Sequence, residues 1–126
     1  MTLRTGQKIS VETLEIELVE QSLLKLGGSL STPTGQTEFR RLLDGLHTQI
    51  VDSHLQGFGV DLRSLSFVNS SAIRVFVDWI SKAAQAHYKL TFHTDSKVTW
   101  HRLSFSVLKS LAPDTVDILD ARAGAS

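Results

Sequence analysis

Two adjacent serines are the residues of this chain whose position best suits chemistry. Ser70 and Ser71 follow a strand-like stretch at 60–68 and the polar Asn69, and a strongly apolar segment starts at Ala72. A strand that turns directly into a helix would place both hydroxyls beside the free N–H groups of the helix start. Because the helix dipole favours negative charge there, the pattern is typical of a site that accepts or holds a phosphate.

The same three polar residues also have a purely structural interpretation. Asn and Ser are preferred at the position that caps a helix N-terminus, and most helices need such a cap. On spacing alone a cap is the commoner explanation, so the residues by themselves leave both interpretations open.

Other combinations of reactive residues are weaker candidates. The five histidines show no metal-ligand spacing, and the chain has no cysteine, so the sequence predicts no metal site. A hydrolase trio of Ser70, His93 and Asp61 lacks the Gly-x-Ser-x-Gly sequence that would hold its nucleophile. The glycines at 27–28 and 57–59 predict turns and no phosphate-binding loop, because no Gly-Lys-Ser or Gly-Lys-Thr follows them. We expect neither an enzyme nor a cofactor.

Alternating apolar patterns predict the elements that hold the two serines. Period-2 alternation predicts one bent strand or two short ones over 9–19, a strand over 22–29 that stops at the glycine pair, and strands at 89–93 and 116–119. Helical spacing predicts amphipathic helices at about 37–53, from 70 onward, and at about 99–112, after a loop at 31–35. The residues expected to face inward are Phe39, Leu42, Leu43, Leu46 and Ile50 in the first helix, Ile73, Phe76, Val77, Ile80 and Ala84 in the second, and Trp100, Leu103, Val107 and Leu111 in the third.

Length and charge predict one modest domain. The 126 residues include 13 basic and 13 acidic side chains, so no net field attracts the chain to nucleic acid or to an anionic membrane. The N-terminus lacks the apolar core of a signal peptide, and no apolar run approaches the ~20 residues of a membrane-spanning helix. We expect a free-standing cytoplasmic domain over residues 1–126, with its core at about 15–120 and a loose tail at 121–126.

The predicted order of strands and helices is that of an α/β sandwich with some parallel pairing. Together with the motifs, this order resembles the STAS domain, the fold of sulfate transporters and anti-sigma-factor antagonists. The resemblance covers about residues 15–120 and implies a mixed sheet of four to five strands with three main helices. It rests on Asn69-Ser70-Ser71-Ala72 in the place of the family's Asp-Ser-Ser-Gly, on the turn Gly27-Gly28-Ser29-Leu30, on the strand Lys89-Leu90-Thr91-Phe92, and on a last helix from Trp100 to Leu111.

The resemblance implies a regulatory protein that works by partner switching. The family's phosphorylated serine corresponds to Ser70. The implied partners are a serine kinase or anti-sigma factor of the histidine-kinase-like ATPase type and a PP2C-type phosphatase. Two residues depart from the family pattern: Asn69 removes a carboxylate beside the serine, and Ala72 replaces a glycine. Both departures bear on recognition by a kinase.

The expected contact surface is the serine turn with the exposed side of the following helix. Trp79 has two interpretations, either as an exposed partner hot spot or as a residue packed on the neighbouring helix. The predicted partner-binding residues are Asn69, Ser70, Ser71, Arg74, Asp78 and Trp79, and the loop at 31–36 is expected to join them.

Other modes of action stay open at this point. The chain could be a constitutive adaptor for a signalling effector, with Ser70 only a helix cap. It could also be a small-ligand module that binds a nucleotide or a lipid. An unpaired terminal strand near Val11 or Val116 could pair with a second copy and give a homodimer.

Overall fold

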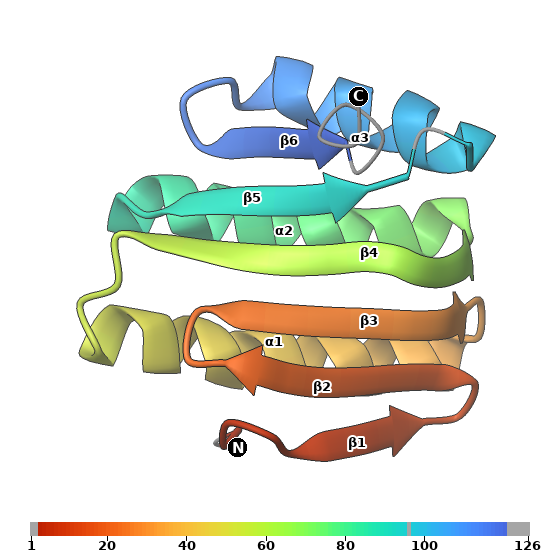
Figure 1. The fold of residues 1–126 in the computed structure, drawn as a ribbon, viewed down its shortest axis with the longest axis horizontal. Helices are drawn as coiled ribbons and strands as arrows, with labels where there is room; N and C mark the ends of the chain where they lie inside the picture. The colour runs from red at the N-terminus through yellow and green to blue at the C-terminus, as the bar shows by residue number, and fades with distance from the viewer. Residues whose placement is uncertain (1–2, 96, 121–126) are drawn as a thin grey trace.

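Six strands form one sheet, and they lie side by side in the order in which they occur along the chain (Figure 1). The chain was analysed as a computed structural model, which describes residues 3–95 and 97–120, apart from the side chains of residues 99–103 and 120. The first three strands pair antiparallel, and β3 through β6 pair parallel. The strands are β1 (Lys8–Val11), β2 (Leu14–Glu20), β3 (Leu23–Leu30), β4 (Gly57–Val68), β5 (Lys89–Thr94) and β6 (Val116–Asp120).

Three helices connect the parallel strands, and they all cover the same face of the sheet (Figure 1). They are α1 (Pro33–Asp52), α2 (Ser70–Ala86) and α3 (Thr99–Leu111). Each helix leads from one strand to the next neighbour in the same direction across the sheet. Because crossover connections between parallel strands are right-handed, consecutive steps in one direction place every helix on one face.

The predicted α/β class is confirmed, and the sheet has one strand more than expected. The stretch predicted as one bent strand or two short ones is two strands, β1 and β2, joined by a tight turn at Glu12 and Thr13. Glu12 adopts a positive φ of 55°, which lets the chain reverse within two residues.

The predicted end of β3 at the glycine pair is wrong, because the strand continues through both glycines to Leu30. Gly28 has a φ of 82°, and a Cβ atom on it would collide with the carbonyl oxygen of Thr13 in the β1–β2 turn. That carbonyl accepts a hydrogen bond from the backbone N–H of Ser29 at 3.1 Å. The glycine therefore serves close packing of the turn against β3 instead of ending the strand.

Two of the three predicted helix faces need correction. In α2, Val75 and Trp79 are buried and Ala84 is exposed, so the buried side is rotated from the predicted one. In α3, Val107 is 58% exposed and Leu111 is 65% exposed, whereas Phe105 and Leu108 are buried. Aromatic packing explains the choice in α3, because the Phe105 ring lies 5.7 Å from that of Phe76 and 5.1 Å from that of Phe92, between ring centroids. The predictions for Trp100 and Leu103 fall on side chains outside the described part of the structure.

The helix-free face of the sheet is polar, which is unusual for parallel strands. Such strands are normally covered on both faces and apolar throughout. Here β5 alternates instead, with Leu90 and Phe92 buried and Thr91 and His93 partly exposed. One row of register partners runs across five strands of this face: Lys8, Glu17, Lys25, Asp61 and His93. Polar side chains at these positions allow this face to stay in contact with water.

Replacing Gly28 by alanine tests the packing of the β1–β2 turn on β3. We expect Gly28→Ala to destabilise the chain by more than the roughly 1–2 kcal/mol of a left-handed alanine, because its Cβ also meets the Thr13 carbonyl. Gly6→Ala is the matched control, since Gly6 has a φ of 86° with no atom within 4 Å of the added Cβ. Urea unfolding of both variants checks this. Equal losses of stability would contradict the close packing.

Candidate functional site

The serine turn lies at the carboxyl end of β4, where α2 begins. Asn69, not a serine, caps the helix, because its side-chain oxygen accepts a hydrogen bond from the backbone N–H of Ala72 at 2.9 Å. Ser70 and Ser71 occupy the first two helical positions, and both are exposed. Within the described part of the chain, neither hydroxyl has a hydrogen-bond partner. The serines are therefore free of the capping role that the sequence alone left open.

Asn69 also fastens the turn to the start of the neighbouring helix. Its side-chain oxygen accepts from the amide of Gln36 at 3.0 Å, and its side-chain nitrogen donates to the carbonyl of Ser31 at 3.0 Å. Its backbone N–H donates to the carbonyl of Leu30 at 3.2 Å. The loop before α1 and the serine turn thus lie together, with Asn69 as the residue that holds them.

The starts of α1 and α2 differ in charge. Thr32 caps α1 by accepting from the backbone N–H of Gly35 at 3.0 Å, and its hydroxyl donates to the carboxylate of Glu12. A carboxylate therefore already lies at the positive end of the α1 dipole. The first turn of α2 contains no acidic residue. The two serines at its N-terminus therefore have no negatively charged side chain next to them in that turn.

Trp79 is buried, which removes it from the predicted partner-binding surface. Its side chain is part of the core at 2% exposure, and its Nε1 donates to the Tyr88 hydroxyl at 3.0 Å. Its ring also packs edge-on against Phe58, at 6.0 Å between centroids. The physical reason is the rotation of α2: Phe76 faces the core, and a residue three positions later lies on the same side of a helix. Packing, not partner contact, is the role of Trp79.

The polar contacts around Trp79 belong to the core. Burial raises the pKa of Tyr88 to about 12, although the hydrogen bond from Trp79 opposes that rise. Nδ1 of His47 lies 2.6 Å from the same hydroxyl. Burial, reinforced by the charge of Lys82, lowers the pKa of His47. These groups satisfy one another's hydrogen-bonding capacity.

Arg74 and Asp78 lie on the exposed side of α2, as do the serines. Asp78 forms an ion pair with Arg40 of α1, with both side chains about half exposed. No ion pair of Arg74 occurs within the described residues. Of the six predicted contact residues, five therefore gather at the start and along the outer side of α2.

Phe67 is a surface residue that the sequence analysis missed. Between Lys25 and Gly27, one residue of β3 lies opposite two residues of β4, and a second extra residue enters β4 opposite the step from Gly28 to Ser29. The first bulge brings Leu65 to the buried side and the second reverses that shift, so Phe67 lies on the helix-free side, as Asp61 does; it is 50% exposed, three residues before Ser70. A phenylalanine in an apolar strand is normally read as core, so the sequence offered no signal for this exposure.

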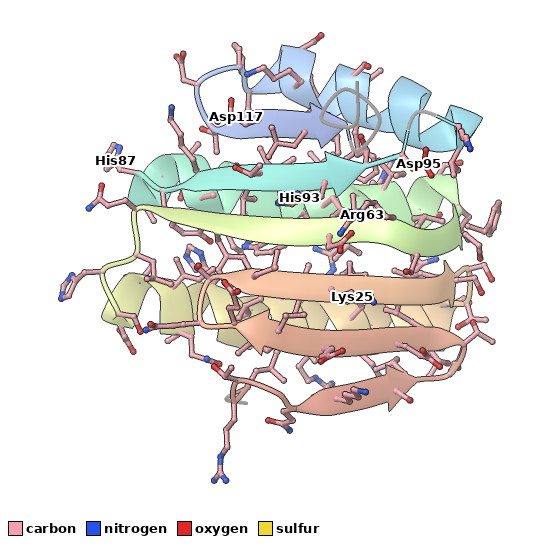
Figure 2. All side chains as sticks on the ribbon, in the orientation of Figure 1. Lys25, Arg63, His87, His93, Asp95 and Asp117 are labelled. Atoms are coloured by element: carbon pink, nitrogen blue, oxygen red, sulfur yellow. The ribbon has the colours of Figure 1, made fainter. Side chains whose placement is uncertain are left out.

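The suggested hydrolase trio does not assemble. Asp61 and His93 are register partners, and His93 lies on the helix-free face (Figure 2), whereas Ser70 begins α2, which covers the other face (Figure 1). The Asp61 carboxylate is also occupied, because it accepts from Nε of Arg63 at 3.0 Å and from a terminal guanidinium nitrogen at 2.8 Å. Burial raises the pKa of Asp61, but these hydrogen bonds and charges outweigh it, so the pKa lies below its usual value. The geometry describes a structural ion pair.

A hollow of about 440 Å³ opens over β1 to β4 on the helix-free face. Two lysines and two glutamates line it, so it has no net charge to select an anion. Within the described residues, no cluster of three or more histidine, aspartate or glutamate side chains is placed to hold a metal ion. The residues that line the hollow are Lys8, Ile9, Ser10, Glu15, Ile16, Glu17, Lys25, Gly27 and Ser64.

Comparison with solved structures places this fold among STAS-like proteins. No protein-family model matches the sequence, and no curated protein matches it. Apo-SiaC from Pseudomonas aeruginosa is similar, with a TM-score of 0.65 and 13% identity over 90% of this chain and 98% of that one. An anti-sigma factor antagonist from Mycobacterium paratuberculosis is similar with a TM-score of 0.55 and 10% identity, over 90% of this chain and 84% of that one. The predicted STAS-like fold is confirmed, in a strongly diverged sequence.

None of the described helices is long and apolar enough to cross a membrane.

Exchange of the cap residue tests which side chain holds the start of α2. We expect Asn69→Ala to cost about 1–2 kcal/mol of unfolding free energy, because the cap and the bonds to Gln36 and Ser31 are lost together. Ser70→Ala should stay within about 0.5 kcal/mol of the unaltered chain, as exposed residues without partners do. Denaturant unfolding measures both. A loss at Ser70 as large as that at Asn69 would show that the cap is misassigned.

Proposed function

We propose that this chain is a non-enzymatic regulator in a partner-switching pathway, controlled by reversible phosphorylation of Ser70. The observation that carries the proposal is that Ser70 is exposed at a helix start whose cap is supplied by Asn69. A hydroxyl without a structural task can be modified without loss of the fold. The STAS-like neighbours support the regulatory class, since one of them is an anti-sigma factor antagonist.

The proposed partner is a serine kinase of the histidine-kinase-like ATPase type that also acts as an anti-sigma factor. It would transfer the γ-phosphoryl group of ATP to the Ser70 oxygen, which gives up its proton while ADP leaves. A PP2C-type phosphatase would hydrolyse the phosphate ester with water and restore the serine. The phosphate adds about 1.5–2 negative charges to the contact surface, enough to disfavour an interface built around a neutral hydroxyl.

The fold tolerates this charge where it is placed. The N–H groups and the dipole of a helix start favour an anion, and the first turn of α2 has no acidic residue to repel one. Phosphorylation would therefore alter the binding surface without unfolding the domain. Release of the partner follows from the changed surface and needs no conformational change.

The proposed contact surface contains Phe67 in place of Trp79 as its apolar residue. A half-exposed phenyl group close to the serine turn suits an interface, where buried aromatic residues supply much of the binding energy. The polar residues around it are Asn69, Ser70, Ser71, Arg74 and Asp78.

The first test is intact-mass spectrometry of the protein purified from its native cells. We expect a mass increase of one phosphate that maps to Ser70 and disappears in Ser70→Ala. We also expect Ser70→Asp to weaken partner binding at least about tenfold, or ~1.4 kcal/mol, in a titration with the recovered partner. Ser81→Asp is the matched control, because Ser81 is an exposed serine of the same helix, eleven residues further on.

The outcomes of this test separate the switch from a constitutive adaptor. Absence of phosphate in every growth condition, with a partner still recovered, would leave an adaptor that binds without modification. Equal weakening by Ser70→Asp and Ser81→Asp would reflect a general effect of added negative charge and would contradict an interface centred on the serine turn. The small-ligand alternative gains no support from the hollow on the helix-free face, because its two lysines and two glutamates leave no net charge to attract a nucleotide.

Truncation of Phe67 tests the apolar part of the contact surface. We expect Phe67→Ala to weaken partner binding about tenfold, because a buried aromatic contact at an interface contributes more than 1 kcal/mol. Stability should change little, since half of this side chain is already in water. Calorimetric titration and urea unfolding measure the two effects. Val107→Ala on α3 is the control, as Val107 is exposed to a similar degree. Unaltered affinity in Phe67→Ala would remove this residue from the interface.

A further inference from the structure

The outer side of α2 carries a row of polar residues at intervals of four: Ser70, Arg74, Asp78 and Lys82. Residues four apart on a helix are neighbours on its surface. The three charged members alternate in sign, and the row begins at the serine turn. A negative group on Ser70 would continue the alternation by one more step.

The two later members of the row are already paired with α1. Asp78 forms an ion pair with Arg40, and Lys82 forms one with Asp44. Both pairs join residues 38 apart in the sequence, so the two helices lie parallel with their turns in step. These pairs account for the charges of Asp78 and Lys82.

Arg74 differs from the other charged residues of the row. It is exposed, and none of the ion pairs among the described residues includes it. Asp78 is the natural partner for an arginine four positions earlier, but its carboxylate is bound by Arg40. No acidic residue occurs in the first turn of α2. Among the described residues, Arg74 is thus a cation without a counter-charge, one helical turn from Ser70.

We propose that Arg74 binds the phosphoryl group on Ser70 and fixes it along the first turn of α2; this inference rests on the proposed function. An anion four residues before a cation is the favourable orientation on a helix, because it agrees with the helix dipole. The guanidinium offers a planar fork of N–H donors that matches two phosphate oxygens. Ser71 lies three residues before Arg74, so a phosphate there would also be within reach.

This pairing gives the modified surface a defined shape. A phosphate held by Arg74 lies over the helix start and withdraws the guanidinium from the partner at the same time. Phosphorylation would thus both add a negative group and remove a positive one from the contact surface. A partner that binds the unmodified surface through Arg74 would lose that contact as well.

The test uses full-length protein with phosphoserine placed at position 70 during synthesis, so that it needs no kinase. The ³¹P resonance is titrated with pH in the otherwise unaltered chain, in Arg74→Gln and in Arg41→Gln. A bound guanidinium favours the doubly charged phosphate, so we expect the midpoint of the titration to rise by roughly 0.3 pH units in Arg74→Gln. Arg41→Gln removes the same charge from an exposed arginine of α1 that pairs with Glu38, and its midpoint should stay unchanged.

Each outcome decides the inference independently of the proposed function. A rise confined to Arg74→Gln, and reduced at high salt, supports the pairing. An unchanged midpoint in Arg74→Gln, or equal rises in both variants, would overturn it, since the second result reflects only a general change of charge. Failure of the proposed function would appear elsewhere, as missing phosphate in cells or as partner binding that ignores Ser70→Asp.

Discussion

The packing of Phe76 is the constraint on which the arrangement of this molecule depends. Its ring meets Phe39 of α1 at 5.6 Å, Phe92 of β5 at 6.1 Å and Phe105 of α3 at 5.7 Å, between ring centroids. One fully buried side chain of α2 thus contacts both other helices and the sheet. Because a helix is rigid, fixing Phe76 fixes the direction of every other α2 side chain. Trp79 must face the core, and the serine end of the outer row must face water.

The site separates the residue that holds the helix from the exposed serines, which the proposed switch would use. Asn69 caps α2 and binds the start of α1 through Gln36 and Ser31, so the turn is held by a side chain that no modification touches. Ser70 then contributes almost nothing to the fold, and its hydroxyl is available at the most anion-tolerant point of the helix. In a family pattern with Asp at this position, the cap would itself carry a negative charge that repels the phosphate of the proposed switch. The amide of Asn69 performs the same capping without that repulsion.

Local patterns in the sequence were sufficient for most of the fold. Period-2 and period-3.6 spacing located the elements to within a few residues, and the order of elements predicted parallel pairing. The errors arose where two segments distant in the sequence meet. Gly28 looks like the end of a strand until the Thr13 carbonyl is seen against it. In α3, the sequence offers two apolar sides, and only the aromatic cluster at Phe105 determines which one packs inward.

The local pattern of the sequence was enough to show that a strand is followed by Asn69, Ser70 and Ser71 and then by an apolar helix. It did not determine which of the three residues caps the helix, since each has a suitable side chain. Tertiary structure decided this, because Gln36 and Ser31 approach only Asn69. It also decided that Trp79 is buried and Phe67 is half exposed, through the rotation of α2 about Phe76 and the irregular pairing of β4 with β3. Both depend on how elements pack against each other, and spacing within one element carries no information about that packing.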